Sequence, residues 1–260
     1  MCFIYTAKRE DELKSAPVSS FSSIYRASLH SRGFFISLGS YIMKNKNSAF
    51  NVKTFVGMAT FAALAYGVTF VFRIPVSFLT FDAKDAVLTV AAFIYGPLAA
   101  LIMALIPALI ELITISGTGI WGFIMNFASS ACFAFTASLI YKYKRSLNGA
   151  IIGIFASVIS TTVLMMLLNL FVTPIYMGVS RDAVIALLPS LLFPFNLAKA
   201  MLNAAITMLI YKPISAAMKR AHLIEGKVDL CFNRQSVIML SVGVVTLAAA
   251  ILIFVFLWTM

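Results

Sequence analysis

Charged residues are scarce in this sequence, and acidic residues are the scarcest. Of 260 residues, 11% are charged and 62% are hydrophobic, and Asp and Glu together number only 9. A water-soluble domain of this size cannot cover its surface with so few charges, so a soluble globular fold is excluded. The sequence therefore predicts an integral membrane protein.

Cysteine and histidine are also rare. The three cysteines, Cys2, Cys132 and Cys231, are far apart and odd in number, which predicts neither a disulfide framework nor a metal site. The two histidines, His30 and His222, both lie in polar segments. We therefore expect no metal centre.

Motifs for nucleotide chemistry and catalysis are absent as well. The glycine-rich stretch SGTGIWG at 116–122 is not followed by the Gly-Lys-Ser/Thr of a phosphate-binding loop, and no dinucleotide fingerprint occurs. No nucleophile spaced with a base supports a membrane enzyme acting on lipid. The chain is therefore expected not to be an enzyme, and it cannot hydrolyse nucleotide by itself.

Long apolar runs are what the sequence has in abundance. One helix needs about 20 mostly apolar residues to span a bilayer. Runs of this kind cover 55–72, 121–141, 149–172, 187–210 and 237–258. A further apolar block, 86–115, is interrupted by Gly96 and Pro97. Because the alternation of a β-barrel is absent, we predict an all-α bundle in one membrane domain.

The basic residues predict how the helices alternate across the membrane. The net charge of +11 is compatible with nucleic-acid binding, but Lys and Arg cluster at the ends of the apolar runs, which is typical of membrane topology. If block 86–115 forms two helices with a tight turn, one side of the membrane keeps only Arg73, Lys84 and Arg181. One long kinked helix would weaken this bias. We therefore predict six core helices with a cytoplasmic N-terminus, and a seventh helix that ends outside.

Three regions follow from this topology. Residues 1–50 are serine-rich and have no spanning stretch, so we expect a mobile cytoplasmic extension or a start codon assigned too early. Residues 51–222 form the six-helix membrane domain. Residues 223–260 add a linker and the extra transmembrane helix.

The second core helix, 86–95, is short for a span. The segment before it, 73–85, must therefore pack against protein or dip into the mouth of the bundle. This segment is aromatic, contains a proline and carries Asp82 and Asp85.

Small residues recur at spacings of four in the first helix. The stretch GMATFAALAYGV places Ala59, Ala63 and Gly67 on one face. Such a face lets another helix approach closely, which is how membrane helices associate when apolar burial gives no advantage over lipid. It predicts either packing within this chain or docking of a partner subunit.

Two ionisable residues lie inside apolar runs. Glu111 belongs to the third helix and Lys199 to the sixth. A charge at the bilayer centre costs about 2.5–3.5 kcal/mol on insertion scales, so such residues usually face the interior and a partner. A functional role is the first hypothesis for both. The alternative is that they only pair with each other, and Glu111 can also reach interfacial water near Ser116.

Asparagines accompany Lys199. Asn196 precedes it by three residues, so the two share one helical face. Asn169 lies in the fifth helix and Asn126 in the fourth. Because amides both donate and accept, Asn169, Asn196 and Lys199 can together hold a polar, hydroxylated or heteroaromatic ligand. A single Asn in a membrane helix more often bridges two helices.

Several segments, in their order along residues 51–220, resemble a known family. They are the small-residue first helix, LTFDAKDAVLTVAAFIYGPLAALI, the SGTG turn leading to GFIMNF, LLNLFVTPIY and PFNLAKAMLNAA. The chain resembles the substrate-binding S components of energy-coupling factor (ECF) vitamin transporters, and within them the riboflavin-specific branch.

This resemblance implies a fold, a ligand and partners. Such proteins are six-helix bundles in the bacterial plasma membrane that capture a vitamin at the outer face, under a lid formed by the loop after the first helix. They deliver it by toppling while docked on one T subunit and two ATPase subunits. The small-residue face of the first helix is then the docking surface. Riboflavin is the transported ligand, and no cofactor is expected.

The resemblance also implies the ligand-binding residues. Asn169, Asn196 and Lys199 match positions that contact the vitamin in the riboflavin branch, and Asp82 and Asp85 belong to the lid loop. Aromatic and aliphatic walls suit a flat ring system, and we expect them from Phe195, Tyr176, Phe78 and Leu79.

The chain departs from the family pattern in two respects. The seventh helix and the long N-terminal extension are not part of the six-helix core. These two additions bear on how the chain docks to its partners and do not affect the proposed ligand site. After Asp82 the chain reads AKD where relatives often read FSD, so lid contacts are expected to differ.

Other functions are compatible with the same residues. One is an S component for another vitamin or for a flavin such as FMN, because Arg73, Lys84 and Arg181 at the outer mouth can accommodate a phosphate. Another is a stand-alone proton-coupled secondary transporter, with Glu111 as proton carrier and Lys199 as its counter-charge, although the inverted repeats common in that class are not apparent. Membrane lipid is an expected partner, and nucleic acid is not.

Overall fold

The computed structural model describes residues 52–76, 78–220 and 234–259. The predicted N-terminal extension at 1–50 and the linker at 223–233 lie outside the described residues, so both remain predictions. The helical unit begins at Val52.

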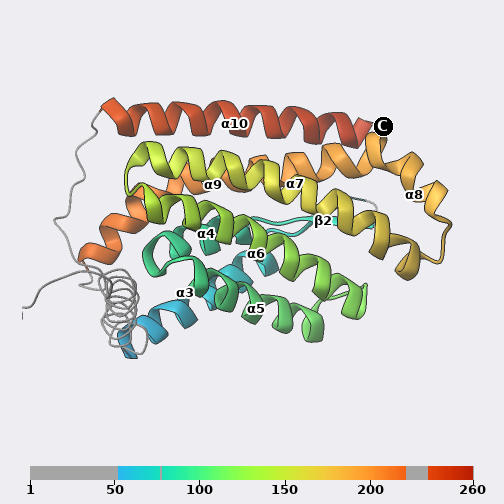
Figure 1. The fold of residues 1–260 in the computed structure, drawn as a ribbon, viewed down its shortest axis with the longest axis horizontal. Helices are drawn as coiled ribbons and strands as arrows, with labels where there is room; N and C mark the ends of the chain where they lie inside the picture. The colour runs from blue at the N-terminus through green and yellow to red at the C-terminus, as the bar shows by residue number, and fades with distance from the viewer. Residues whose placement is uncertain (1–51, 77, 221–233, 260) are drawn as a thin grey trace, which may run out of the picture. The chain divides into compact units, whose positions relative to one another are not determined.

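The described chain is almost entirely helical (Figure 1). Its long helices are α3 (Val52–Val71), α5 (Pro97–Thr114), α6 (Gly119–Tyr143), α7 (Leu147–Met177), α9 (Phe193–Arg220) and α10 (Arg234–Thr259). The shorter elements are β1 (Ile74–Val76), β2 (Leu79–Phe81), α4 (Lys84–Tyr95), α8 (Arg181–Leu187) and the π-helical turn η1 (Leu188–Leu192). The predicted all-α bundle with an additional C-terminal helix is confirmed.

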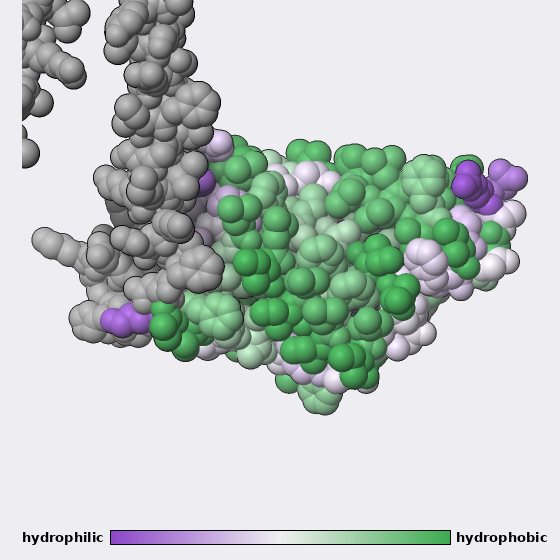
Figure 2. Space-filling model, turned by 60° about the horizontal axis from the view of Figure 1, so that its bottom comes forward, coloured by the Kyte–Doolittle hydropathy of each residue, from purple (hydrophilic) through white to green (hydrophobic). Residues whose placement is uncertain are grey.

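The described residues contain 6 helical segments long and apolar enough to cross a membrane. They are Val52–Val71, Pro97–Thr114, Gly119–Tyr143, Leu147–Met177, Arg181–Ile214 and Ser236–Leu257. Figure 2 shows hydrophobic residues across the middle of one face of the helical unit. Lipid tails offer no hydrogen bonds, so a surface of this kind suits the bilayer core. The multi-pass membrane character of the chain is confirmed.

The apolar block 86–115 forms two helices, as the charge pattern predicts. α4 ends at Tyr95 and α5 begins at Pro97. Gly96 between them has a φ of 95°, in the left-handed region that glycine adopts without a Cβ clash. The fixed φ of Pro97 suits the first position of the next helix. Two residues are therefore enough to reverse the chain inside the bundle.

α4 is the central helix of the unit and not a membrane span. With 12 residues it is too short to cross a bilayer. Every residue from Lys84 to Phe93 is buried, and the helix packs against α3, α5, α6 and α9. Its N-terminal end therefore carries charged residues into the middle of the bundle.

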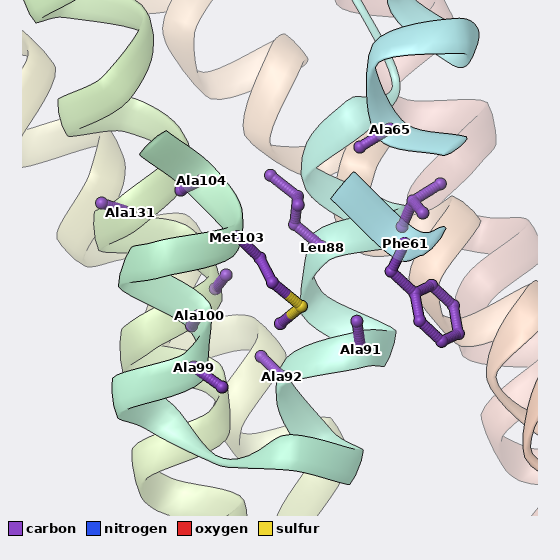
Figure 3. Packing of buried hydrophobic residues seen from close by; sticks show 12 residues of the cluster. Phe61, Ala65, Leu88, Ala91, Ala92, Ala99, Ala100, Met103, Ala104 and Ala131 are labelled. Carbon is purple, nitrogen blue, oxygen red and sulfur yellow. The ribbon is translucent and has the colours of Figure 1, made fainter. Parts of the chain in front are cut away.

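Alanine-rich faces let α3, α4 and α5 approach closely. One cluster combines Ala91 and Ala92 of α4 with Ala100 and Met103 of α5 and Phe61 of α3. In Figure 3, Met103 reaches from α5 toward α4 between small side chains. Membrane helices gain most from such packing of small residues, because lipid is as apolar as the helix surface.

A short antiparallel hairpin, which the sequence alone does not predict, follows α3. The paired residues are Ile74 with Phe81, Pro75 with Thr80 and Val76 with Leu79. Val76 and Phe81 are buried. The expectation that segment 73–85 packs against protein is confirmed.

Candidate functional site

A cavity of about 380 Å³ lies between the hairpin, the α5–α6 turn, α6, α7 and α9. Small-molecule sites commonly enclose roughly 300–1,000 Å³. The polar lining includes Asp82, Glu111, Asn126, Asn169, Asn196 and Lys199, and the apolar lining includes Phe78, Leu79, Trp121, Tyr176 and Phe195. The cavity thus brings together all seven residues expected to contact a ligand.

Lys199 is held at this cavity by the segment that precedes α4. Its Nζ donates to Asp82 Oδ2 at 2.7 Å and to the carbonyl oxygen of Thr80 at 3.3 Å. The residue is only 9% exposed. An ammonium has three donors, so one remains for a ligand. The alternative that Lys199 pairs with Glu111 is wrong, because Asp82 is the carboxylate in contact with it.

Glu111 has a cation of its own. Lys84 Nζ donates to its two carboxylate oxygens at 2.6 and 2.8 Å, and Asn126 Nδ2 donates to Oε2 at 3.0 Å. Burying such a pair is tolerable only when both charges are matched and hydrogen-bonded, as they are here. Lys84 is 1% exposed, so its expected position at the outer mouth is wrong. The proton-coupled hypothesis treats Lys199 as the counter-charge of Glu111, but each of these residues forms its ion pair with another side chain.

Asp82 directly follows β2 and Asp85 lies near the start of α4, and their assignment to a lid remains a prediction. They are 3% and 2% exposed. Asp85, in the first turn of α4, accepts a hydrogen bond from the Ser130 hydroxyl of α6. Among the described residues, Asp82 Oδ1 has no hydrogen-bond partner.

The charge of Asp82 is set by its neighbours. Burial by itself raises the pKa of this carboxyl, but the charges of Lys199 and Lys84 outweigh burial and hold the pKa below its ordinary value. Asp82 is therefore an ionised acceptor. In the described part of the chain, no group of three or more His, Cys, Asp or Glu side chains is arranged to hold a metal ion.

The two predicted asparagines are partly engaged by their own helices. Asn169 Nδ2 donates to the Met165 carbonyl at 2.7 Å, and its Oδ1 accepts from the Thr173 hydroxyl at 2.9 Å. Asn196 Nδ2 donates to the Leu192 carbonyl at 2.7 Å. Each side-chain amide has a second N–H, so both retain a donor for a ligand. Contact of either with a ligand remains a prediction.

Aromatic walls come from three different elements. The ring of Phe78, at the hairpin turn, lies 6.3 Å from the ring of Tyr176 on α7, measured between centres. Phe195 of α9 packs on Phe81 of β2 at 4.5 Å. Leu79 adds an aliphatic surface beside them. A flat ring system suits such walls, while the polar groups fix its orientation.

Asn203 does not line the cavity but supports residues that do, and the sequence alone does not single it out. It is fully buried and ties α9 to the start of α4. Its Oδ1 accepts from the Ala86 N–H at 2.9 Å, and its Nδ2 donates to the carbonyls of Asp82 at 2.9 Å and Lys199 at 3.0 Å. Its only signal in the sequence is that Asn196, Lys199 and Asn203 follow helical spacing along one face.

Replacing Asn203 with Leu is expected to destabilise the protein. The change conserves approximate volume but leaves the Ala86 N–H and the Asp82 carbonyl without this partner, at about 1–3 kcal/mol for each buried unsatisfied group. Thermal unfolding in detergent should give a Tm several degrees lower. Thr207→Val is the matched control, because the buried Thr207 hydroxyl bonds only to the carbonyl of Asn203 within its own helix. If Asn203→Leu unfolds at a Tm as high as that of the control, the hydrogen bonds of Asn203 to the start of α4 do not stabilise the protein.

The small-residue face of α3 points away from the bundle. Ala59, Ala63 and Gly67 are exposed, whereas Phe61 and Ala65 lie in the core. A Cβ added at Gly67 would meet no atom within 4 Å. Within the described residues, the alternative of packing inside this chain is therefore wrong. Docking of a partner on this face remains a prediction.

Arg73 and Arg181 are exposed, as expected for residues at the mouth. Arg73 lines the cavity and donates to the carbonyl of Ile115 at 2.7 Å. The Arg181 guanidinium lies 5.9 Å from the ring centre of Phe171 on α7. Only Arg73 of the pair is therefore placed to meet a ligand.

Comparisons match the chain to known membrane transport proteins. The sequence model described as "ECF transporter, substrate-specific component" matches residues 53–211. Riboflavin transporter RibU of Staphylococcus aureus (strain TCH60) is 32% identical over 178 residues, covering 65% of this chain and 93% of the relative. Riboflavin transporter FmnP of Bacillus subtilis (strain 168) is 24% identical over 159 residues, covering 56% of this chain and 83% of the relative.

A solved structure has the same fold. It is described as the S component of a bacterial ECF transporter and matches with a TM-score of 0.56 at 30% identity, covering 65% of this chain and 98% of that chain. The family match ends at residue 211, so α10 lies beyond it.

Proposed function

The chain belongs to the family of ECF transporter substrate-specific components, and on this premise we propose that it captures riboflavin for an ATP-driven importer. Two relatives named as riboflavin transporters support the choice of ligand. The observation that carries the proposal is the cavity in which Lys199, Asn169 and Asn196 face aromatic walls. In this proposal the vitamin enters from the extracellular side and the protein is not an enzyme.

The cavity has the chemistry that a flavin requires. The flavin ring is flat, with carbonyl oxygens and one N–H along one edge, and the ribityl chain carries hydroxyls. Lys199 and the two amides supply donors, and the unpaired Asp82 Oδ1 supplies an acceptor. Because Asp82 already neutralises Lys199, a neutral ligand can bind without leaving a buried charge uncompensated.

Charge balance favours riboflavin over FMN. Asp82 pairs with Lys199 and Glu111 with Lys84, so the ion pairs offer no spare positive charge to a phosphate. Among the described residues that line the cavity, Arg73 is the cation without a carboxylate partner, and it lies at the mouth. FMN would therefore have to place its phosphate at the mouth.

In this proposal, ATP hydrolysis belongs to partner subunits. The sequence has no nucleotide-binding motif. The exposed face of Ala59, Ala63 and Gly67 suits close approach of a T subunit that carries two ATPase subunits. The bias of Lys and Arg supports a cytoplasmic N-terminus in the plasma membrane. Riboflavin is cargo here, and no cofactor is invoked.

Gently purified protein is expected to carry bound riboflavin. Cells grown with riboflavin should yield a yellow preparation whose flavin absorbance survives washing, because the ligand is enclosed between aromatic walls. Mass spectrometry of the extracted small molecule identifies it. Recovery of FMN would correct the ligand within the flavins, and recovery of a different vitamin would remove the riboflavin assignment while keeping the family.

A further inference from the structure

The C-terminal helix α10 lies beyond the part of the chain that matches the family, yet it packs along α9 (Figure 1). Near its start, Ser236 Oγ accepts a hydrogen bond from Lys212 Nζ at 3.0 Å. Midway, Gly243 permits close contact, because a Cβ there would lie 3.2 Å from Cβ of Met208. The helix is therefore fixed to α9 along its length.

The last turns of α10 pack on the hairpin. One apolar cluster joins Ile253, Phe254 and Leu257 of α10 with Val76 and Phe81 of the hairpin and Phe195 of α9. The Phe81 and Phe254 rings meet edge to face, 5.0 Å apart at an angle of 84°. Phe81 also packs on Phe195, which lines the cavity. Phe81 thus contacts both α10 and a wall of the cavity.

The hairpin depends on such contacts for its position. Each strand has only 3 residues, and an isolated two-stranded hairpin is at best marginally stable. Phe78 in its turn and Leu79 at the start of β2 line the cavity. A ligand in the cavity would lie against these two side chains. Contacts that hold the hairpin in place would therefore slow the release of that ligand.

We propose that α10 clamps the hairpin over the ligand cavity, with Phe254 and Leu257 as positioning residues. The proposal rests on the proposed function in so far as the cavity holds a ligand. Neither residue lines the cavity itself, so both act on a ligand through the residues that they pack against, Phe81 among them. The clamp is a feature of this chain's extra helix, outside residues 53–211.

The clamp has a kinetic signature. An edge-to-face aromatic pair contributes beyond its buried area, and losing it raises the population of the lifted hairpin up to about tenfold. Release passes through the lifted hairpin, so the dissociation rate constant rises by the same factor. Binding passes through the same lifted hairpin, so the association rate constant is expected to rise as well, and the Kd to change less than either rate constant.

Stopped-flow release of riboflavin from the full-length protein tests this proposal. Phe254→Ala is expected to speed dissociation by up to about tenfold, and Leu257→Ala to speed it as well. Phe254→Tyr keeps an aromatic ring at this position, so this variant should release riboflavin about as slowly as wild type. Leu252→Ala is the matched control, because Leu252 lies on the same helix and is 71% exposed. Equal release rates for wild type and both clamp variants would overturn the proposal.

Hydrogen exchange of the ligand-free protein tests the clamp without any ligand. The backbone amides of Ile74, Val76 and residues 79–81 should exchange faster in Phe254→Ala than in wild type, while those of α6 should not change. Unchanged exchange at these amides would overturn the clamp. If the wild-type protein does not bind riboflavin, the proposed function is wrong. The hydrogen-exchange result then decides by itself whether α10 holds the hairpin in place.

Discussion

Replacing Lys199 with Ala is expected to weaken riboflavin binding by about 10- to 150-fold, because a hydrogen bond from a charged donor contributes roughly 1.5–3 kcal/mol. Lys199 is buried at the cavity, and Asp82 and the Thr80 carbonyl engage two of its three donors. The third is the donor expected to meet a carbonyl oxygen of the flavin ring. Quenching of riboflavin fluorescence at equilibrium measures the Kd.

The same substitution also removes the cation beside Asp82. Leaving a buried charge without its partner costs about 3–5 kcal/mol of stability, so weaker binding by Lys199→Ala alone has two explanations. A second substitution, Asp82→Asn, removes the orphaned charge. The double variant should recover much of the lost Tm but not the affinity. Recovery of wild-type affinity would mean that Lys199 acts only by neutralising Asp82.

Replacing Ala63 with Trp is expected to abolish riboflavin uptake and leave binding intact. Ala63 is exposed on α3, and the only α3 residue that lines the cavity is Thr69. A bulky side chain in a close helix interface costs roughly 1–3 kcal/mol or more by overpacking, which is enough to lower the occupancy of a docked complex about tenfold or further. Uptake by cells that express the complete transporter measures the effect.

The matched control for this experiment is Ala248→Trp. Ala248 is exposed on α10, away from the α3 face, so the same substitution there should leave uptake unchanged. If Ala63→Trp also lost binding in purified protein, the α3 face would have a role inside the binding subunit. If it kept both binding and uptake, partner docking would have to use another surface.

The helical framework was predictable because its signals are local. Apolar runs of spanning length mark the long helices, and the charge pattern separates α4 from α5 at Gly96 and Pro97 without any tertiary information. Helical spacing places Asn196 and Lys199 on one face, and the structure puts both on the cavity. Spacing of four likewise identifies the exposed face of α3.

The ion pairs were not predictable because they join distant segments. Lys199 and Asp82 are 117 residues apart in the chain, and Lys84 and Glu111 are 27 apart. Charge counting assigns Asp82 and Lys84 to a loop at the membrane surface. Asp82 and Lys84 are buried because the short helix α4 inserts into the bundle. This insertion depends on packing against four neighbouring helices, which the local sequence does not reveal.

The hairpin escaped prediction for a different reason. Strands of 3 residues are too short for a period-two pattern to stand out from an apolar loop. Phe81 contacts α9 and the last turns of α10, and neither contact can be read from the local sequence. Part of the packing around the hairpin thus comes from a helix more than 150 residues away along the chain.

Titration of purified wild-type protein with riboflavin, beside the Lys199→Ala variant, tests the central claim most directly. The account predicts saturable quenching with equimolar stoichiometry for wild type, and a much weaker Kd for the variant. Absence of quenching by the folded wild-type protein would contradict riboflavin as the ligand. Equal affinity in the two proteins would contradict the site built around Lys199.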